Sequence, residues 1–209
     1  MLLSEGVAKV PLLKAAEAAA RGGADALQLR LKETPDREVL NLARALRQLT
    51  RDYGVFFVIN DRPDIALLVE ADAVHVGQED LPAAAVRRLL PPTVRLGVST
   101  HSLAQAQQAV ADGADHIGVG PIYATATRGY REGKGLGLLR EVAAKVHVPI
   151  IAIGGITAEN AREVKTAGAS AIAVCRAVLA ADDIAAATCR LKHIVAEEAE
   201  SARENGGAT

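Results

Sequence analysis

Aromatic side chains are almost absent from this chain. Tryptophan does not occur, and Phe and Tyr make up only 2% of the 209 residues. Half of the residues are nevertheless hydrophobic, so the core must be built from Ala, Val, Leu and Ile. A chain of this length buries enough of these side chains to form one domain with a substantial core.

The sequence also lacks a charge excess, a membrane-spanning run and a cysteine motif, and each absence argues against a class of function. Cationic and anionic residues nearly balance, 24 against 25, so no overall charge draws the chain to nucleic acid or to an acidic membrane. No apolar run approaches the ~18 residues of a membrane helix, and the first six residues lack a signal-peptide pattern. Cys175 and Cys189 have neither metal-ligand nor redox spacing. We therefore expect a cytoplasmic protein with reduced thiols that binds neither nucleic acid nor membrane.

Short apolar runs alternate with longer amphipathic runs along the chain. The short runs predict seven strands, at 24–30, 55–60, 73–76, 94–99, 115–120, 149–153 and 171–174. The longer runs predict helices at 12–21, 36–53, 63–70, 82–90, 103–112, 138–146, 158–167 and from 183 to about 199. Because the strands are apolar throughout, they are expected to be buried on both faces, as in a parallel sheet with helical crossovers.

These βα units predict a single α/β domain over residues 1–197, followed by a polar, Gly-rich tail at 198–209 that is expected to be disordered. A (βα)8 TIM barrel needs an eighth strand before the first helix. Residues 1–10 offer only two short apolar runs, so this first strand should be short, irregular or missing. The alternative is an open doubly wound sheet. We favour the barrel because polar residues follow nearly every strand, around a whole ring.

Two of the predicted strands are followed by a carboxylate. Asp61 follows the run at 55–60, and Asp80 lies just beyond the run at 73–76. The carboxyl ends of parallel strands share one rim, so both acids can point at one spot. Two converging carboxylates suit a magnesium ion that carries a pyrophosphate.

Cations are placed to face such a group. Gln28 and Arg30 alternate onto one side of their strand, and Lys32 continues the series. Arg128 lies in the long loop at 121–136. Each cation alone is more often a solvated surface charge, but three of them opposite two carboxylates fit a magnesium pyrophosphate better.

A second phosphate site is suggested by Gly154-Gly155, which precede a helix expected to begin near Thr157. Glycines let backbone N–H groups approach a phosphate, and barrels often bind phosphate after their last two strands. A tight turn is the alternative interpretation. Thr125 and Thr127 lie in the 121–136 loop and can donate hydroxyl groups to the same phosphate.

No motif for a covalent nucleophile is present. The five histidines lack metal-ligand spacing and are expected to be structural: His75, His101, His116, His147 and His193.

Taken in order, several motifs resemble those of the thiamine-phosphate synthase family from about Leu12 to Leu179. They are Gln-Leu-Arg-Leu-Lys at 28–32, Ile-Asn-Asp at 59–61, His-Val-Gly-Gln-Glu-Asp at 75–80, Gly-Val-Ser at 97–99, Gly-Pro-Ile-Tyr-Ala-Thr-Ala-Thr at 120–127 and Ile-Gly-Gly-Ile-Thr at 153–157. The resemblance implies a (βα)8 enzyme that joins hydroxymethylpyrimidine diphosphate to 4-methyl-5-(2-phosphooxyethyl)thiazole. Thiamine phosphate and pyrophosphate would be the products of a magnesium-assisted, dissociative reaction.

The resemblance also implies roles for individual residues. The pyrimidine diphosphate would be bound by Gln28, Arg30, Lys32, Asn60, Ser99 and Arg128. Four of these, Arg30, Lys32, Ser99 and Arg128, would be catalytic. Mg²⁺ would be held by Asp61 and Asp80. The thiazole phosphate would be bound by Thr125, Ala126, Thr127, Gly155, Cys175 and Arg176.

The chain departs from the family pattern at three places. Leu31 stands where a Glu is usual, Arg128 where a Lys is common, and Cys175-Arg176 where many members have a small or apolar pair. Two other functions stay open. One is a thiazole tautomerase of the same barrel family. Such an enzyme lacks the carboxylate pair, and its catalytic His falls where this chain has Pro121. The other is a non-catalytic barrel that binds a phosphorylated ligand. We expect two phosphorylated small molecules as partners and a homodimer as a possible assembly.

Overall fold

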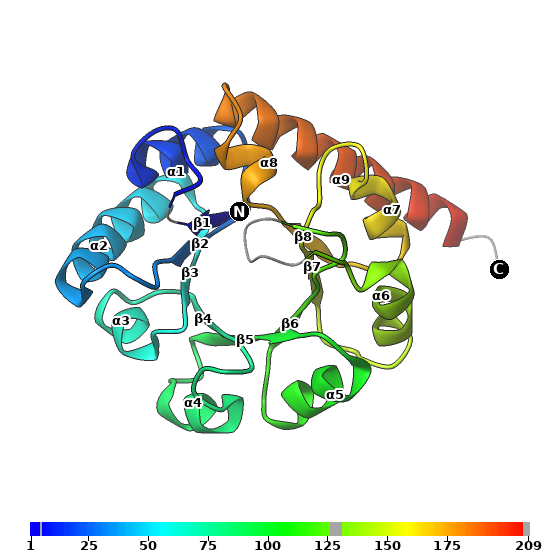
Figure 1. Cartoon of the computed structure of the whole chain (residues 1–209), viewed down its shortest axis with the longest axis horizontal. Coiled ribbons are helices and arrows are strands. Elements are labelled where there is room, and N and C mark those ends of the chain that lie inside the picture. Colours follow the sequence, from blue (N-terminus) through cyan, green and yellow to red (C-terminus); the bar gives the residue numbers. More distant parts are fainter. Residues whose placement is uncertain (5, 126–130, 207–209) are drawn as a thin grey trace.

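The protein is a closed ring of parallel strands surrounded by helices (Figure 1). The structure is a computed structural model that describes all residues except 5, 126–130 and 207–209, and no side chains beyond residue 196. Its sheet has eight strands in the order β1 to β8, and each strand pairs in parallel with the next. The predicted (βα)8 barrel is confirmed, and the open doubly wound alternative is wrong.

The elements follow one another as repeated βα units. The strands are β1 (Leu2–Ser4), β2 (Ala26–Arg30), β3 (Phe56–Asn60), β4 (Ala73–Val76), β5 (Arg95–Thr100), β6 (His116–Val119), β7 (Ile150–Ile153) and β8 (Ala171–Ala173). The helices are α1 (Leu12–Arg21), α2 (Asp36–Tyr53), α3 (Pro63–Leu68), α4 (Ala83–Leu89), α5 (Leu103–Ala111), α6 (Gly135–Ala143), α7 (Ala161–Thr166), α8 (Arg176–Leu179) and α9 (Ile184–Gly206).

The first strand is short but present, and it closes the barrel. Leu2 pairs with Gln28 of β2, and its N–H donates to the carbonyl of Val174, just beyond β8, at 2.9 Å. Leu2 and Leu3 are buried in the aliphatic core. Pairing on both sides therefore stabilises a strand that is too short to be evident from hydrophobic pattern.

Several helix boundaries differ from the predicted ones, and three of the larger differences concern α6, α7 and α9. α6 begins at Gly135 rather than 138, and α7 begins at Ala161 rather than 158. α7 starts late because the side chain of Asn160 accepts the Thr157 N–H at 2.8 Å and donates to the Gly155 carbonyl at 3.0 Å, which holds this segment in a turn. α9 continues past the predicted end near Ala199 to Gly206, so the tail predicted from residue 198 begins as helix. Ala, Glu and Arg in this stretch favour that conformation.

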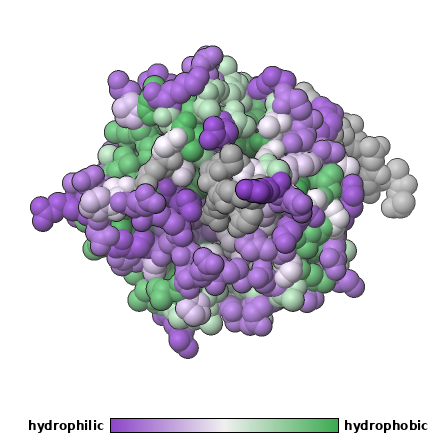
Figure 2. All heavy atoms as spheres, in the orientation of Figure 1, coloured by the Kyte–Doolittle hydropathy of each residue, from purple (hydrophilic) through white to green (hydrophobic). Residues whose placement is uncertain are grey.

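The face of the molecule seen in Figure 2 is largely polar. Figure 2 shows hydrophilic side chains over most of the visible face, with smaller hydrophobic patches between them. Within the part of the chain that the structure describes, no helix is both long and apolar enough to cross a membrane.

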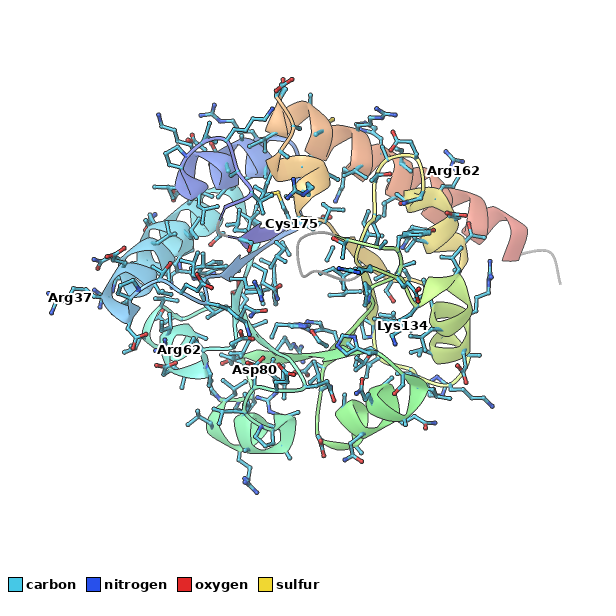
Figure 3. All side chains as sticks on the ribbon, viewed as in Figure 1. Arg37, Arg62, Asp80, Lys134, Arg162 and Cys175 are labelled. Carbon is cyan, nitrogen blue, oxygen red and sulfur yellow. The ribbon has the colours of Figure 1, made fainter. Side chains whose placement is uncertain are left out.

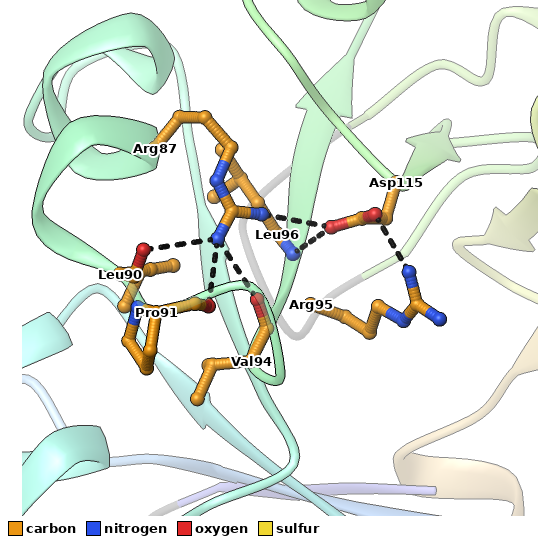
Figure 4. A network of polar contacts seen from close by, with 7 residues as sticks. All are labelled: Arg87, Leu90, Pro91, Val94, Arg95, Leu96 and Asp115. Atoms are coloured by element: carbon orange, nitrogen blue, oxygen red, sulfur yellow. Dashed lines mark hydrogen bonds and ion pairs between the residues drawn. The ribbon is translucent and has the colours of Figure 1, made fainter.

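At the amino ends of the strands, Asp115 joins β5 to the start of β6 (Figure 4). Its carboxylate accepts the Leu96 N–H at 2.7 Å, Arg87 Nη1 at 3.0 Å and Arg95 Nη1 at 3.1 Å. Arg87 Nη2 also donates to three backbone carbonyls, those of Leu90, Pro91 and Val94. The guanidinium thereby ties α4 and the turn after it to this carboxylate.

The same arrangement occurs earlier in the barrel. The carboxylate of Asp72, directly before β4, accepts a hydrogen bond from the Phe57 N–H at 2.7 Å. It also accepts hydrogen bonds from Arg47 Nη1 at 2.8 Å and Arg47 Nη2 at 3.0 Å. Both aspartates thus pair with an Arg from a preceding helix and with a strand N–H. Such carboxylates stabilise the fold, because their hydrogen-bonding capacity is used within the protein.

We expect Arg87→Met to lower the free energy of unfolding by about 2–3 kcal/mol, because it removes a charged donor from a partly buried carboxylate and from three backbone carbonyls. Arg95→Met is the matched control: Arg95 contacts the same Asp115, but its side chain is 61% exposed, so its loss should cost less than about 0.5 kcal/mol. Urea unfolding followed by circular dichroism measures both. Equal effects of the two substitutions would contradict this account of the network.

Candidate active site

A cavity of about 430 Å³ opens among the carboxyl ends of the strands. Six of the site residues predicted from sequence line it: Gln28, Ser99, Thr125, Gly155, Cys175 and Arg176. Further walls come from apolar side chains such as Ile151, Ile153 and Ile172. A concave, mostly apolar cavity with a few convergent polar groups is the usual form of a small-molecule site.

At the same carboxyl-end rim, the two predicted acids converge on one cation. Lys32 Nζ lies 3.0 Å from Asp61 Oδ2 and 3.7 Å from Asp80 Oδ1. The acid side chains are only 18% and 20% exposed, whereas that of Lys32 is 48% exposed. The predicted convergence of Asp61 and Asp80 is therefore present, with an ammonium group bound to both acids.

Local backbone geometry holds each acid in place. Asp61 has φ +64°, in the left-handed region that Asp tolerates better than most residues, and its N–H donates to the His75 carbonyl at 2.8 Å. Asp80 Oδ2 accepts the Gly77 N–H at 2.8 Å. A Cβ at Gly77 would lie 2.9 Å from that same oxygen, so a larger residue there would push the carboxylate away.

The surroundings shift the pKa values of the two carboxyl groups in opposite directions. Burial, and then the neighbouring Asp80 carboxyl, raise the pKa of Asp61 against the opposing effect of Lys32. Burial also acts to raise the pKa of Asp80, but the hydrogen bonds from Asp61 and the Gly77 N–H, together with Lys32, outweigh it and the net shift is downward. Two acids this close do not both ionise freely without a cation.

This donor set fits a magnesium ion. Two carboxylates meet at one point, and a cationic group already lies against both. Among the described residues no group of three or more His, Cys, Asp and Glu side chains forms a metal cluster. A metal held here would therefore take its other oxygen ligands from water and phosphate, which is how Mg²⁺ commonly binds.

Two more predicted residues place polar groups near the acids. Asn60 ends β3 and is only 6% exposed, and its Nδ2 has no hydrogen-bond partner among the described residues. Ser99 on β5 shares a hydrogen bond of 2.8 Å with His75 Nε2, and its carbonyl accepts Gln78 Nε2 at 2.7 Å. A buried amide donor without a protein partner is free to donate to a ligand or to a water molecule.

His75 and His101 line the cavity, although sequence reasoning gave them only a structural role. His75 packs beside His116 with ring centroids 5.9 Å apart. A Cβ at Gly97 would lie 2.5 Å from His75 Nδ1 and 2.2 Å from His116 Nε2, so the glycine makes room for both rings. Burial lowers the pKa of His116. A polar residue between two buried valines of β4 was the available signal for His75.

The predicted phosphate turn is held by close packing. Gly154 and Gly155 have φ +103° and +63°. A Cβ on Gly155 would lie 2.7 Å from both the Ala124 carbonyl oxygen and Tyr123 Cβ. The glycines are thus required by the turn itself. The helix expected at Thr157 begins later, and the Thr157 N–H already binds Asn160, so the predicted contribution of a helix N-terminus at Thr157 was wrong.

Across the barrel from the acids, Cys175 follows β8 and Arg176 begins α8. Figure 3 shows Asp80 and Cys175 on opposite sides of the ring, while Arg37 points outward from α2. Burial raises the pKa of the Cys175 thiol, so the thiol stays protonated at neutral pH.

The remaining predicted positions, Ala126, Thr127 and Arg128, lie outside the described residues. Arg30 ends β2 and so precedes Lys32 on the same rim.

The fold and the site together define a TIM-barrel enzyme. Its cavity and the cluster of Asp61, Asp80 and Lys32 lie at the carboxyl-end rim of the barrel, where such enzymes have their active sites. A family model described as thiamine monophosphate synthase matches residues 3–178. The thiamine-phosphate synthase of Moorella thermoacetica is 51% identical, and the match covers 88% of this chain and 89% of that protein. The thiamine-phosphate synthase of Chloroflexus aurantiacus is 50% identical, and the match covers 89% of this chain and 86% of that protein. The structure of thiamine phosphate pyrophosphorylase from Pyrococcus furiosus superposes with a TM-score of 0.88, at 40% identity over 94% of this chain and 95% of that one. The chain belongs to the thiamine monophosphate synthase family, and it is an enzyme of the transferase class.

We expect Asp61→Asn to raise the thermal midpoint by about 2–4 °C at neutral pH, equivalent to about 1 kcal/mol. The pKa of Asp61 is higher in the folded than in the unfolded chain, so its ionisation favours unfolding. This penalty grows as pH rises from the unfolded to the folded pKa and is complete above the latter. The gain from Asn should therefore shrink as pH falls toward the ordinary carboxyl range.

Asp64→Asn is the control with the opposite sign, because Arg62 lowers the pKa of Asp64. Its carboxylate stabilises the fold above the unfolded pKa, so the substitution should lower the midpoint slightly at neutral pH. Scanning calorimetry across pH 4–8 separates the two. A lower midpoint for Asp61→Asn at pH 7 would contradict the electrostatic account.

Proposed function

We propose that the enzyme condenses 4-amino-2-methyl-5-hydroxymethylpyrimidine diphosphate with 4-methyl-5-(2-phosphooxyethyl)thiazole to give thiamine phosphate and pyrophosphate. The observation that carries the proposal is the convergence of Asp61, Asp80 and Lys32 at the rim that also holds the cavity. Family membership supports the reaction type, and the acid–lysine cluster supports a metal-dependent departure of pyrophosphate.

The bond changes need no protein nucleophile. The bond between the pyrimidine methylene carbon and the diphosphate oxygen breaks, and that oxygen keeps the electron pair. The thiazole nitrogen then uses its lone pair to form the new carbon–nitrogen bond. The electron-rich aminopyrimidine stabilises the cationic carbon between the two events, so the reaction is dissociative.

The chain's own residues are proposed to bind and stabilise the departing group. Magnesium held by Asp61 and Asp80 would neutralise negative charge that builds on the pyrophosphate. Arg30 and Lys32 at the end of β2, with Arg128 from the loop, would donate to its oxygens. The pyrimidine itself would be held by Gln28, Asn60 and Ser99, the last of them oriented by its hydrogen bond to His75.

The acceptor would bind on the opposite side of the cavity. Thr125 and Gly155 lie there with Cys175 and Arg176, and Ala126 and Thr127 follow in the sequence. Anchoring the thiazole by its phosphate would aim its nitrogen at the methylene carbon, which removes much of the entropic barrier to a two-substrate reaction. The isoleucines of β7 and β8 would exclude water from the cationic carbon.

The alternative functions fit the site less well. A thiazole tautomerase would have a catalytic histidine where this chain has Pro121, which the structure packs against Gly154. A barrel that only binds a phosphorylated ligand has no need for two partly buried acids beside the site. Both alternatives leave the cluster of Asp61, Lys32 and Asp80 unexplained.

We expect purified protein to form thiamine phosphate from the two substrates only when Mg²⁺ is present. Asp61→Ala and Asp80→Ala should each lower kcat by on the order of 10²-fold or more, the usual effect of losing one electrostatic contact to a developing charge. Asp182→Ala is the control, because that carboxylate is on the surface, with its side chain 96% exposed, and its ion pair is with Lys9. Chromatographic detection of thiamine phosphate measures all three variants.

Two results would contradict the proposal. Full activity in excess chelator would remove the metal from the mechanism. Isomerisation of a thiazole carboxylate phosphate without condensation would identify the protein as a tautomerase.

A further inference from the structure

We propose that Lys32 acts as an internal counter-cation that competes with the metal for Asp61 and Asp80 and moves to the diphosphate when both ligands are bound. Metal and diphosphate then bind cooperatively, and each binds weakly without the other. The inference deepens the proposed function, and it rests on the magnesium site proposed there.

The first support is geometric. Lys32 Nζ contacts Asp61 Oδ2 at 3.0 Å and Asp80 Oδ1 at 3.7 Å. These oxygens belong to the two carboxylates that would bind the metal, and the ammonium charge beside them repels a divalent ion. In the free enzyme a divalent ion therefore competes with Lys32 for the two acids.

The second support is a difference in mobility. The acids are held by the backbone, through the positive φ of Asp61 and the Gly77 N–H bound to Asp80. Lys32 lies just beyond the end of β2, has a four-carbon stem, and is 48% exposed. Its ammonium group can change partners by rotation of four side-chain bonds, whereas each acid has a short side chain and that of Asp80 is held by the Gly77 N–H.

The third support is the charge of the cluster. With two carboxylates and one ammonium, the cluster in the free enzyme carries one net negative charge, which repels a diphosphate. A divalent ion brings the summed charge of the acids, the ammonium and the metal to one net positive charge, and it also displaces the ammonium from the acids. Phosphate oxygens bound to the metal would then offer Lys32 new anionic partners.

Binding linkage makes the effect reciprocal. If the diphosphate favours the state in which Lys32 has left the acids, it must raise the affinity for metal by the same factor by which metal raises the affinity for diphosphate. A lysine at this position therefore weakens metal binding when no substrate is present. An acid pair with no lysine between them would bind the metal independently.

The test compares the full-length protein with Lys32→Met and Lys32→Arg. Free Mn²⁺ is measured by electron paramagnetic resonance during titration of each protein without other ligands. We expect Lys32→Met to bind Mn²⁺ about threefold to fivefold more tightly than the unsubstituted protein, which is the upper range for the loss of one partly exposed ion pair. Lys32→Arg, which keeps the charge, should stay within about twofold of it. Lys9→Met is the matched control, because Lys9 forms an exposed ion pair with Asp182 at 2.6 Å, and it should leave Mn²⁺ affinity unchanged.

A second titration measures cooperativity. Inorganic pyrophosphate is titrated calorimetrically into each protein, once with chelator and once with excess Mg²⁺. The unsubstituted protein should bind pyrophosphate at least about tenfold more tightly with Mg²⁺, and this ratio should fall several-fold in Lys32→Met. An unchanged ratio, or equal Mn²⁺ affinities of Lys32→Met and the unsubstituted protein, would overturn the role of Lys32 and leave the proposed reaction intact.

One further variant separates this failure from failure of the metal site. Asp61→Asn should abolish Mn²⁺ binding both when it is introduced alone and when it is combined with Lys32→Met, with near-ultraviolet circular dichroism confirming an intact fold. Mn²⁺ binding that is unaffected by Asp61→Asn would show that the metal lies elsewhere, and it would overturn both the metal site and the competition by Lys32.

Discussion

Parallel pairing of eight strands around a closed ring brings all their carboxyl ends to one rim and all their amino ends to the other. Closure depends on β1, which pairs with β2 and donates the Leu2 N–H to Val174 beyond β8. The two rims use the same residue type differently. At the amino ends, Asp72 and Asp115 are bound by arginines and strand N–H groups, so their charge is used in stabilising the fold. At the carboxyl ends, Asp61 and Asp80 share a single lysine, which leaves them available to a ligand.

Much of this could be predicted from sequence because it depends on local pattern. Apolar runs located seven strands, and a carboxylate directly after a buried run located Asp61. The first strand, β1, was expected only as short, irregular or missing, because three residues carry no periodic signal and only pairing on both sides stabilises them. The ion pairs of Arg47 and Arg87 join residues 25 and 28 positions apart, so no local pattern reveals them. The late start of α7 depends on a side-chain contact of Asn160 that competes with the helix.

The convergence of the two acids in the candidate site was predicted, but their contact with Lys32 was not. Sequence reasoning assigned Lys32 to the diphosphate and the two aspartates to the metal, as if these were separate partners. The structure places Lys32 on the aspartates themselves. His75 was also assigned a structural role, and its contact with Ser99 follows from strand register, which pairs His75 with Gly97, close to that serine on β5. Both cases show that side chains on neighbouring strands combine in ways that the spacing within one strand does not specify.

The central claim is that Asp61 and Asp80 form a metal site from which Lys32 is displaced onto a diphosphate. A crystal structure of the protein grown with Mn²⁺ and inorganic pyrophosphate tests it most directly, since anomalous scattering locates the metal independently of its expected ligands. The account predicts one Mn²⁺ bound by oxygens of both aspartates and of the pyrophosphate, with Lys32 Nζ within hydrogen-bonding distance of a phosphate oxygen and no longer in contact with the acids. A Mn²⁺ ion bound elsewhere, or Lys32 still bound to both acids with pyrophosphate present, would contradict it.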